Sequence, residues 1–437
     1  MYAPASELEL RDILRRANEN RTPITIAGAG TGVAGGRVPL SGWVVSLEKF
    51  RELAVEPGRL RAGAGVPLRE VQRAALNAGQ FYPPDPTETW ASIGGTIATN
   101  ASGSRSFRYG GTRRYVKALR IMHASGTLRE YRRGEAIDFE VPDIPRPNTT
   151  KHAVGYDLHP GMDWVDLFIG SEGTLGVVTA AELELLPRPQ APLGGVVFFS
   201  GETAAVDAVE QWRGIPRLNL LEYLDAASLQ LLRPLYGNIP AGAGAALMIE
   251  QEAGDADEWL DRLQGAGAFE SSWFAEEGPD LERFREFRHA LPRQINAMVA
   301  SLGAMKWSTD CAVPVARQRE MLAFYRERMA VAFAGRCFVF GHIGDAHLHV
   351  NLLAPGDEQQ RASGLILECA RRAVALGGTV SAEHGLGKRK AHLLELQYGV
   401  AAIEAMRTVK KRLDPYGALG HGTLFASRIV AEPNDAE

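Results

Sequence analysis

The stretch Phe340-Gly341-His342-Ile343-Gly344-Asp345-Ala346-His347-Leu348-His349-Val350-Asn351 brings three histidines together around a Gly-Asp turn. Short apolar runs flank the turn, which predicts a β-hairpin. Because side chains alternate along a strand, His347, His349 and Asn351 should share one face, with the apolar residues on the other. His342 ends the partner strand and can approach His349 across the turn. Three imidazoles beside an apolar face indicate a metal site rather than a solvated loop.

A second stretch, Ser381-Ala382-Glu383-His384-Gly385-Leu386-Gly387, supplies a carboxylate and a further imidazole. Glu383 is the kind of ligand that completes a two-histidine, one-carboxylate site, and His384 beside it can remain free as a base. Taken singly, each histidine is more often a hydrogen-bonded structural residue than a ligand. Four of the ten histidines fall in these two glycine-punctuated stretches, and this clustering favours the functional interpretation.

Composition narrows the class of protein. A chain of 437 residues predicts two or three domains, and 45% hydrophobic with 23% charged residues is typical of a globular protein. The net charge of −4 and the lack of a Lys/Arg run give no support to nucleic-acid binding. Three widely spaced cysteines form neither a disulfide framework nor a CxxC site, and they indicate a reducing compartment.

The sequence predicts a cytoplasmic protein with no membrane span. Its beginning lacks the basic and apolar regions of a signal peptide, and no apolar run approaches the ~20 residues that a transmembrane helix requires. The 47 glycines gather in particular loops. Because glycine lets the backbone approach a ligand closely, these loops point to a large cofactor.

The first glycine-rich loop follows a short buried strand, 23–27, and runs from Gly28 to Gly36. Its backbone N–H groups can cradle a pyrophosphate, because no Cβ keeps the anion away. No Gly-Lys-Ser/Thr follows, so it is not a P-loop, and 38–42 cannot start the helix that a Rossmann site requires. A plain glycine loop between strands is the alternative. A rigid turn at 81–87 precedes two more such loops, at 91–103 and 170–178.

Pro187, Pro189 and Pro192 predict a domain boundary, because proline ends regular elements. Beyond them, strand and helix patterns alternate, which predicts one sheet covered by helices. Within this part we expect a strand at Lys306–Ala312 and a helix at Arg317–Phe333.

The three glycine loops, in this order and together with the 341–351 and 381–387 stretches, resemble flavoproteins of the vanillyl-alcohol-oxidase type. Within that type they are most similar to the branch of D-lactate and D-2-hydroxyglutarate dehydrogenases and glycolate oxidase, over nearly the whole chain. The resemblance implies an α+β fold: a two-subdomain FAD-binding domain of the PCMH type at 1–190, and an α+β cap domain at 191–395. The cap would hold a helix-covered antiparallel sheet and the metal site, and 396–437 would return to the FAD domain.

The resemblance also implies where FAD is held. Gly28–Gly32 would contact the pyrophosphate, and the later loops would line the flavin. Neither His nor Cys occurs in 28–36 or 94–103, so FAD would be bound without a covalent link. The implied FAD-binding residues are Gly28, Gly30, Thr31, Gly32, Gly35, Pro84, Asp85, Ser92, Gly94, Gly95, Asn100, Ser102, Gly103, Glu172, Gly173 and Val178.

The implied reaction suits the histidine and carboxylate cluster. A 2-hydroxy acid offers a carboxylate oxygen and a hydroxyl oxygen, a natural five-membered chelate for a divalent ion that makes the hydroxyl more acidic. By resemblance, His342, His349 and Glu383 hold the ion, and imidazole with carboxylate permits Zn, Mn or Fe. His384 would be the base, because a free imidazole with a pKa of ~6.5 suits that task.

Substrate contacts follow from the same resemblance, with two departures. Arg288 and Lys306 would bind the substrate carboxylate and Asn351 would also contact the substrate; solvated surface charges are the alternative for the two cations. The family's usual Gly-Asp-Gly-Asn is here 344–347, ending in His347, for which we expect substrate binding, while a fourth or a displaced metal ligand stays open. The family's Asn-Pro-Gly-Lys is here 420–423, so His421 is either a bystander or a neighbour of the flavin.

The leading hypothesis is therefore FAD- and metal-dependent oxidation of a D-2-hydroxy acid, such as D-lactate, glycolate or D-2-hydroxyglutarate, to the 2-oxo acid. Pro292 occupies the region where the family has a second substrate-binding residue with a hydroxyl, which weakens the case for a dicarboxylate among these substrates. The alternatives are a flavin oxidase of another alcohol that uses O2, a metallohydrolase, and a non-catalytic binding protein. An electron acceptor is implied but not identified, and a homodimer or partner subunits stay open.

Overall fold

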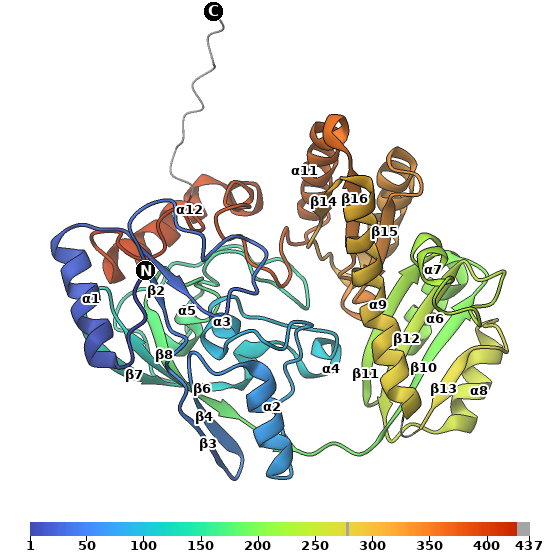
Figure 1. Cartoon of the computed structure of the whole chain (residues 1–437), viewed down its shortest axis with the longest axis horizontal. Helices are drawn as coiled ribbons and strands as arrows, with labels where there is room; N and C mark the ends of the chain where they lie inside the picture. The colour runs from blue at the N-terminus through green and yellow to red at the C-terminus, as the bar shows by residue number, and fades with distance from the viewer. Residues whose placement is uncertain (277–278, 426–437) are drawn as a thin grey trace, which may run out of the picture.

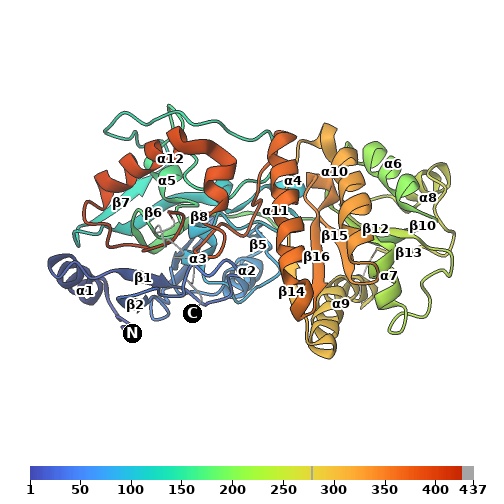
Figure 2. The ribbon, with the colours of Figure 1, turned by 90° about the horizontal axis from the view of Figure 1, so that it is seen from above.

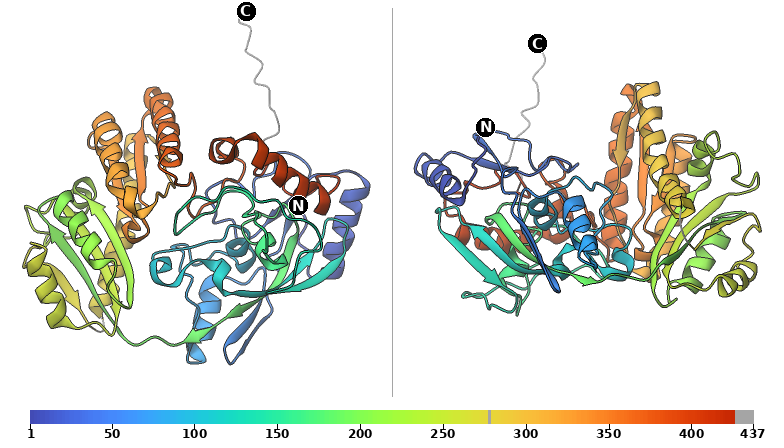
Figure 3. Two further views of the ribbon diagram at one scale, coloured as in Figure 1. Left: turned by 180° about the vertical axis from the view of Figure 1, so that it is seen from behind. Right: turned by 60° about the horizontal axis from the view of Figure 1, so that its bottom comes forward.

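A computed structural model of the chain describes residues 1–276 and 279–425. Figure 1 shows two lobes, the first built from the N-terminal elements together with α12 (Leu393–Leu413), the second from the elements between β10 (Pro192–Phe199) and α11 (Gln359–Ala375). An extended segment between β9 (Leu186–Pro187) and β10 (Pro192–Phe199) carries the chain from one lobe to the other; the rear view in Figure 3 shows its course.

The first lobe is organised on a five-stranded antiparallel sheet in the order β3-β4-β8-β6-β7. Two further two-stranded sheets are separate from it: the parallel pair β1–β2 and the antiparallel pair β5–β9. The elements of this lobe are α1 (Glu7–Glu19), β1 (Ile24–Ala27), β2 (Trp43–Ser46), β3 (Leu53–Glu56), β4 (Arg59–Gly63), α2 (Leu68–Asn77), β5 (Gln80–Phe81), α3 (Ile93–Ala98), α4 (Ser106–Tyr109), β6 (Val116–Met122), β7 (Leu128–Arg132), α5 (Trp164–Phe168), β8 (Val177–Glu184) and β9.

Two glycine loops of this lobe take different forms. No helix follows the first loop, which runs directly into β2, as its sequence indicates. The second loop is partly helical, which corrects the expectation of an irregular loop at 91–103: α3 forms within it. The helix begins because the Ser92 hydroxyl accepts a hydrogen bond from the Gly95 backbone N–H at 3.3 Å and so caps the first turn.

The second lobe is organised on a seven-stranded antiparallel sheet in the order β13-β10-β12-β11-β15-β16-β14. Its elements are β10, α6 (Glu202–Trp212), β11 (Leu218–Asp225), α7 (Ala226–Leu232), β12 (Ala245–Glu252), α8 (Ala256–Gly265), β13 (Trp273–Ala275), α9 (Pro279–Leu302), β14 (Met305–Ser308), α10 (Gln318–Phe324), β15 (Cys337–Gly341), β16 (His349–Ala354) and α11 (Gln359–Ala375).

Helices cover both faces of this sheet. Along β10, Val196 and Phe198 pack into the core beneath α7 and α9, whereas Val197 and Phe199 pack into the core beneath α6, α8, α10 and α11. This alternation follows from the two-residue repeat of a strand. Figure 2 shows α7 and α9 on one side of the sheet and α6 and α10 on the other. The predicted α+β fold with a helix-covered antiparallel sheet is confirmed.

One expected helix of this lobe forms with an irregular winding, and one expected strand is shorter than predicted. The helix predicted at Arg317–Phe333 is present, but after α10 the chain winds as a π-helix over Tyr325–Ala330. The strand at Lys306–Ala312 ends at Ser308, beyond which Ala312 bridges instead to His347 and Thr379. The chain therefore leaves the sheet edge where the 381–387 stretch approaches.

The lobes are joined by ion pairs as well as by the chain. Arg105, next to α4, donates Nε and Nη2 to the two carboxylate oxygens of Glu250 on β12, each at 3.0 Å. Arg108 lies 2.7 Å from Glu252 and donates to Asn219 Oδ1 on β11 at 2.6 Å. In Figure 1 α4 lies between the lobes beside β11.

The chain returns to the first lobe after α11. Figures 1 and 2 show α12 lying on that lobe. The following segment runs beside β1: the Ile24 backbone N–H donates to Ala418 O at 2.6 Å, and the Gly420 N–H donates to Ile24 O at 2.8 Å. The first lobe is therefore completed by residues from both ends of the described chain.

We expect Arg105→Met to destabilise the protein by roughly 3 kcal/mol, because removing one partner of a largely buried pair leaves the other charge uncompensated. The Arg105 and Glu250 side chains are only 21% and 13% exposed. Thermal unfolding of the purified protein measures the loss. Arg283→Met is the matched control, since the Arg283 side chain is 72% exposed. An unfolding temperature of Arg105→Met equal to that of the control would contradict the expectation.

Candidate active site

The predicted hairpin forms from β15 and β16, with Phe340 opposite His349. One 3-10 turn connects the strands, and Ala346 closes it in the left-handed region with φ +51°. This turn brings the three imidazoles together. The ring centroids of His347 and His349 are 4.6 Å apart, and the ring centroid of His342 lies 5.3 Å from that of His347 and 5.5 Å from that of His349. The predicted clustering is present in the structure.

Glu383 lies among these rings. Its Oε1 is 3.4 Å from His342 Nε2, 3.3 Å from His349 Nε2 and 3.8 Å from His384 Nε2. One donor atom each from His342, His347, His349 and Glu383 lie within 4.8 Å of one another. Such a compact set of nitrogen and oxygen donors has the composition of a divalent metal site.

The other carboxylate oxygen of Glu383 is held by the first lobe. Ser102 Oγ donates to Oε2 at 3.1 Å, and Lys151 Nζ lies 3.4 Å from it. The buried Lys151 ammonium also contacts Asp345 at 3.3 Å and donates to Gly103 O at 3.0 Å. Although burial opposes its charge, Glu383 and Asp345 raise the pKa of Lys151, which stays an ammonium. Glu383 therefore presents Oε1 alone to the histidines.

Asp310 holds the second stretch in place. Its Oδ1 is 3.1 Å from His347 Nε2 and 3.2 Å from His384 Nδ1. Its Oδ2 accepts hydrogen bonds from Ser381 Oγ at 2.5 Å and from the His384 backbone N–H at 2.9 Å. A single buried carboxylate thus orients two imidazoles and the turn that carries Glu383.

Glu222 connects the histidine cluster to α9. It lies buried in β11, with Oε1 2.5 Å from His342 Nδ1. Arg288 of α9 donates Nη2 to the same oxygen at 3.3 Å and Nε to Oε2. Arg288, which was predicted to bind the substrate, is therefore separated from His342 by Glu222, which contacts both.

Burial and charge give the imidazoles different protonation states. Burial and Lys151 oppose a charge on His342, but Glu222 and Glu383 outweigh them and raise its pKa to about 9. Burial, together with His349, lowers the pKa of His347 to about 3. Burial also lowers the pKa of His384, against the influence of Asp310. His347 and His384 are therefore neutral near pH 7 and able to accept a proton or a metal ion.

The remaining predicted substrate contacts lie along β14 and β16. Asn351 is opposite Ser308, whose hydroxyl donates to Asn351 Oδ1. Lys306 lies two residues before Ser308 and so projects from the same face, but it is exposed, and its Nζ donates to Asn296 Oδ1 at 2.7 Å. Asn351 is thus close to the cluster, whereas Lys306 is at the solvent edge.

A cavity of about 310 Å³ opens beside this cluster, lined by first-lobe loops and by Glu383 and His384. The predicted cofactor residues that line it are Gly28, Gly30, Thr31, Gly32, Ser92, Gly95, Ser102, Gly103 and Glu172. The predicted cofactor residues outside its lining are Gly35, Pro84, Asp85, Gly94, Asn100, Gly173 and Val178. The loops predicted to bind one cofactor therefore converge on this cavity, although some of the predicted residues lie outside its lining.

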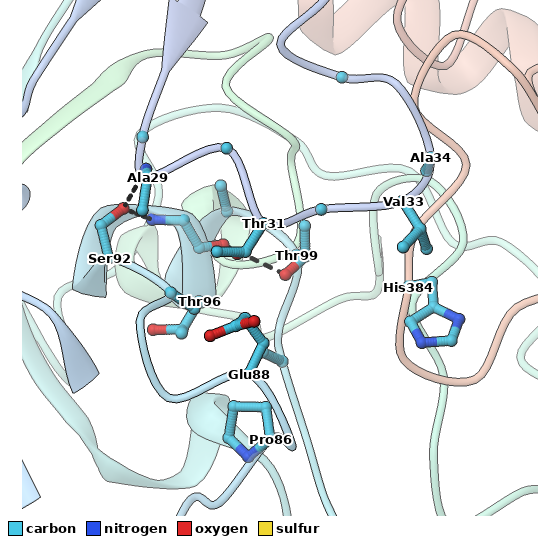
Figure 4. Close-up of a pocket in the computed structure, with 18 of the residues that line it drawn as sticks. Ala29, Thr31, Val33, Ala34, Pro86, Glu88, Ser92, Thr96, Thr99 and His384 are labelled. Atoms are coloured by element: carbon cyan, nitrogen blue, oxygen red, sulfur yellow. Dashed lines mark hydrogen bonds between the residues drawn. The ribbon is translucent and has the colours of Figure 1, made fainter. Parts of the chain in front are cut away.

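Figure 4 shows how the cavity is built. The Ser92 hydroxyl accepts from the backbone N–H groups of Ala29 and Gly95, at 3.4 and 3.3 Å, which ties the first glycine loop to α3. His384 lies at the far end of the cavity, beside Val33. The cavity thus leads from the glycine loop to the predicted base.

Some predicted cofactor residues have structural partners. Asp85 accepts hydrogen bonds from the Arg105 backbone N–H and from Ser104 Oγ, each at 3.0 Å. Asn100 Oδ1 accepts from the Arg113 N–H at 3.0 Å. These side chains shape the loops behind the cavity.

Glu172 joins the third glycine loop to the 381–387 stretch. Its carboxylate accepts from the backbone N–H groups of Leu386 at 2.8 Å and Gly387 at 2.7 Å. Burial raises the pKa of Glu172 to about 7, against these hydrogen bonds. Gly385 has φ +70°, and a Cβ there would stand 2.8 Å from the Glu172 carboxylate, so the turn requires glycine.

Three residues that contact the cluster were missed from the sequence: Glu222, Asp310 and Lys151. Glu222 stands in the apolar run 218–224 and Asp310 precedes the apolar run 311–313; a charge among buried residues requires a partner, so both could have been found. Lys151 follows two threonines in an irregular segment and gives no such signal. His421 is half-buried and does not belong to the lining of the cavity.

Comparison with protein families identifies both lobes. Residues 1–132 match the model of an FAD binding domain, and residues 188–424 match that of the C-terminal domain of FAD linked oxidases. The chain belongs to the FAD-linked oxidases. The predicted resemblance is confirmed, and this FAD-linked oxidase is an oxidoreductase that uses FAD.

Curated relatives match the oxidase over almost its whole length. The chain is 32% identical to glycolate oxidase subunit GlcD of Bacillus subtilis, covering 99% of this chain and 91% of that protein. It is 31% identical to a probable mitochondrial D-lactate dehydrogenase of Danio rerio, covering 97% and 83%. It is 29% identical to D-2-hydroxyglutarate dehydrogenase of Xanthomonas citri pv. viticola, covering 97% and 88%.

Solved structures show the same fold. A structure of alkyldihydroxyacetonephosphate synthase superimposes with a TM-score of 0.70 at 18% sequence identity, covering 96% of this chain and 75% of that one. In the described part of the oxidase, no helix is both long and apolar enough to cross a membrane.

The residues of the cavity fit FAD. Gly32 borders it, and a Cβ added there would meet no atom within 4 Å, so the backbone faces open space that a side chain would enter. Ala29 and Gly95 border the same space through backbone that Ser92 fixes. Closely approaching glycine backbone is what a pyrophosphate requires.

We expect Gly32→Val to fold normally but to lower FAD affinity about tenfold or more, a cost of only ~1.4 kcal/mol. The new side chain would stand in the cavity without a clash against the protein. Flavin content after purification and fluorescence titration with FAD measure the effect. Gly214→Val in the second lobe is the control, since a Cβ there also meets nothing within 4 Å. Full retention of FAD by Gly32→Val would contradict this placement.

In protein from which metal has been removed, the titration of His342 makes the free energy of unfolding depend on pH. Its folded pKa of about 9 exceeds the ~6.5 of an unfolded histidine, so protonation favours the folded state. This stabilisation is complete below about pH 6.5 and is lost as the pH rises through about 9, with a magnitude of order 3 kcal/mol.

Unfolding measured between pH 6 and 9.5 (roughly the window between these two pKa values) should therefore show a flatter pH dependence in His342→Gln than in the wild type. The exposed His392→Gln is the control and should keep the wild-type slope. Equal slopes in wild type and His342→Gln would show that His342 is not the charged member of the cluster.

Proposed function

We propose that this FAD-linked oxidase oxidises a D-2-hydroxy acid of the D-lactate or glycolate class to the 2-oxo acid, with a divalent metal ion beside the flavin. Relatives named glycolate oxidase subunit, D-lactate dehydrogenase and D-2-hydroxyglutarate dehydrogenase support the substrate class. FAD supplies the hydride acceptor when bound. The electron acceptor that reoxidises it is a separate molecule, for which these names give no single candidate.

One observation carries the proposal: Glu383 belongs to both the cavity and the histidine cluster, and His384, which also lines the cavity, has its ring centroid 5.5 Å from that of His349. A substrate between the flavin and the metal ion would therefore meet a ligand set and a base at once. We also propose that 1–190 binds FAD, 191–395 supplies the metal and substrate contacts, and 396–437 completes the first part.

His384 is the proposed base. Its lowered pKa keeps the imidazole neutral near pH 7, the form that accepts a proton. Asp310 lies 3.2 Å from Nδ1, which leaves Nε2 toward Glu383 and the cluster. A carboxylate behind the imidazole also stabilises the imidazolium that forms when the substrate hydroxyl loses its proton, as in other acid–base pairs of this kind.

Arg288 and Asn351 are the proposed substrate contacts. Arg288 uses Nε and Nη2 on Glu222, which leaves Nη1 for a substrate carboxylate. Asn351 lies on the same strand face as His349, two residues away. Lys306 lies farther along that face and would suit the distal end of a longer substrate.

The metal ligands are proposed to include His342, His349 and Glu383. The fit rests on their donor chemistry and on the 3.3–3.4 Å separations of Glu383 Oε1 from two imidazole nitrogens. A divalent ion supplies a Lewis acid that makes the substrate hydroxyl more acidic. Glu222 beside His342 Nδ1 supplies the outer carboxylate that metal-binding histidines commonly have.

The proposal predicts that anaerobic addition of D-lactate or glycolate bleaches the flavin of the purified protein, and that L-lactate does so far more slowly. His384→Gln should keep FAD but slow the bleaching by about 10²–10⁴-fold, the usual contribution of a general base. Stopped-flow absorbance measures both. Chelator treatment should slow the wild type, and added metal should restore it.

The exposed His392→Gln is the control and should be bleached at the wild-type rate. Equal rates for His384→Gln and wild type would disprove the role of His384 as base. Rapid bleaching by simple alcohols, with none by 2-hydroxy acids, would overturn the substrate class. Faster turnover with O2 than with an artificial acceptor would favour the oxidase alternative.

A further inference from the structure

His347 occupies a distinct position in the histidine cluster. It is fully buried, and its ring centroid lies 4.6 Å from that of His349 and 5.3 Å from that of His342. Its backbone is fixed as well, because the His347 N–H donates to His342 O at 3.1 Å. The side chain is therefore enclosed with the proposed ligands rather than directed into solvent.

Only one of the two ring nitrogens of His347 has a partner. Asp310 Oδ1 lies 3.1 Å from Nε2, whereas Nδ1 is buried and has no hydrogen-bond partner among the described residues. A buried polar atom without a partner costs about 1–3 kcal/mol. A carboxylate on one nitrogen and a metal ion on the other is the common arrangement of a ligating histidine, and it satisfies both atoms.

We propose that His347 is a fourth protein ligand of the divalent ion, which is then held by His342, His347, His349 and Glu383, with Asp310 fixing the ring of His347. One donor atom from each of the four ligands already lies within 4.8 Å of the others. This inference rests on the metal ion of the proposed function. It replaces substrate binding as the role of His347.

Four protein ligands restrict the metal. In tetrahedral Zn²⁺ sites four protein ligands leave no open position, which is typical of structural zinc. An octahedral ion such as Mn²⁺ or Fe²⁺ keeps two positions, the number that the carboxylate and hydroxyl oxygens of a 2-hydroxy acid require. Four protein ligands would therefore suit an ion that takes six ligands, with the substrate supplying the other two.

The test uses the FAD-loaded protein after removal of metal by chelator, with Mn²⁺ as the probe. Pulsed EPR of the Mn²⁺-loaded wild type should show three coordinated imidazoles. In His347→Gln it should show two, and Mn²⁺ affinity measured by calorimetry should fall about 10-fold or more. Glutamine can still donate to Asp310 from its amide, so the neighbouring hydrogen bond is retained.

The exposed His392→Gln should match the wild type in affinity and imidazole count. Two imidazoles in the wild type, or an unchanged affinity in His347→Gln, would overturn the inference while leaving the metal-dependent reaction in place. An unchanged affinity with a raised KM for D-lactate would likewise overturn it and assign His347 to the substrate. No Mn²⁺, Fe²⁺ or Zn²⁺ binding by the wild type would overturn both proposals. If His347→Gln does not fold, the imidazole count of the wild type still decides.

Discussion

The site depends on one buried carboxylate, Asp310. Because a buried charge is costly unless every oxygen has partners, Asp310 forces its neighbours into fixed positions. Oδ1 contacts two imidazoles and Oδ2 accepts from the turn at 381–384, so strand edge, hairpin and turn are held together at one point. The early end of β14 is part of this arrangement. Because the chain leaves the sheet after Ser308, Asp310 can reach the cluster.

Both lobes contribute residues to a single site. Glu383 comes from the segment that follows the second lobe, yet Ser102 and Lys151 of the first lobe hold its Oε2. Glu172 of the first lobe holds the same segment through two backbone N–H groups. Contacts of this kind couple the cavity to the cluster, because a displacement of one lobe would move Glu383 away from the histidines.

The sequence predicted those parts of the site whose geometry is decided by a few neighbouring residues. The hairpin, its three histidines and the glycine loops are each contained within about a dozen residues, where turn residues and strand alternation decide the geometry. Contacts such as those of Glu222 with Arg288 join residues far apart in sequence and depend on how strands pair. The partial helix at α3 escaped prediction because Ser92 was interpreted as a loop residue rather than a cap.

Charge balance is the last constraint that these contacts impose. Around the cluster, the carboxylates of Glu222, Asp310, Asp345 and Glu383 meet two cations, Lys151 and Arg288. These acids outnumber the two cations in contact with them, although Arg213 also acts on Asp345 and Lys390 on Asp310, and a buried excess of negative charge is unfavourable. Without metal, the protein offsets part of it by protonating His342, whose pKa rises to about 9. A divalent ion would offset this excess while the imidazoles stay neutral and able to coordinate, so the same buried acids that hold the histidines also favour the ion.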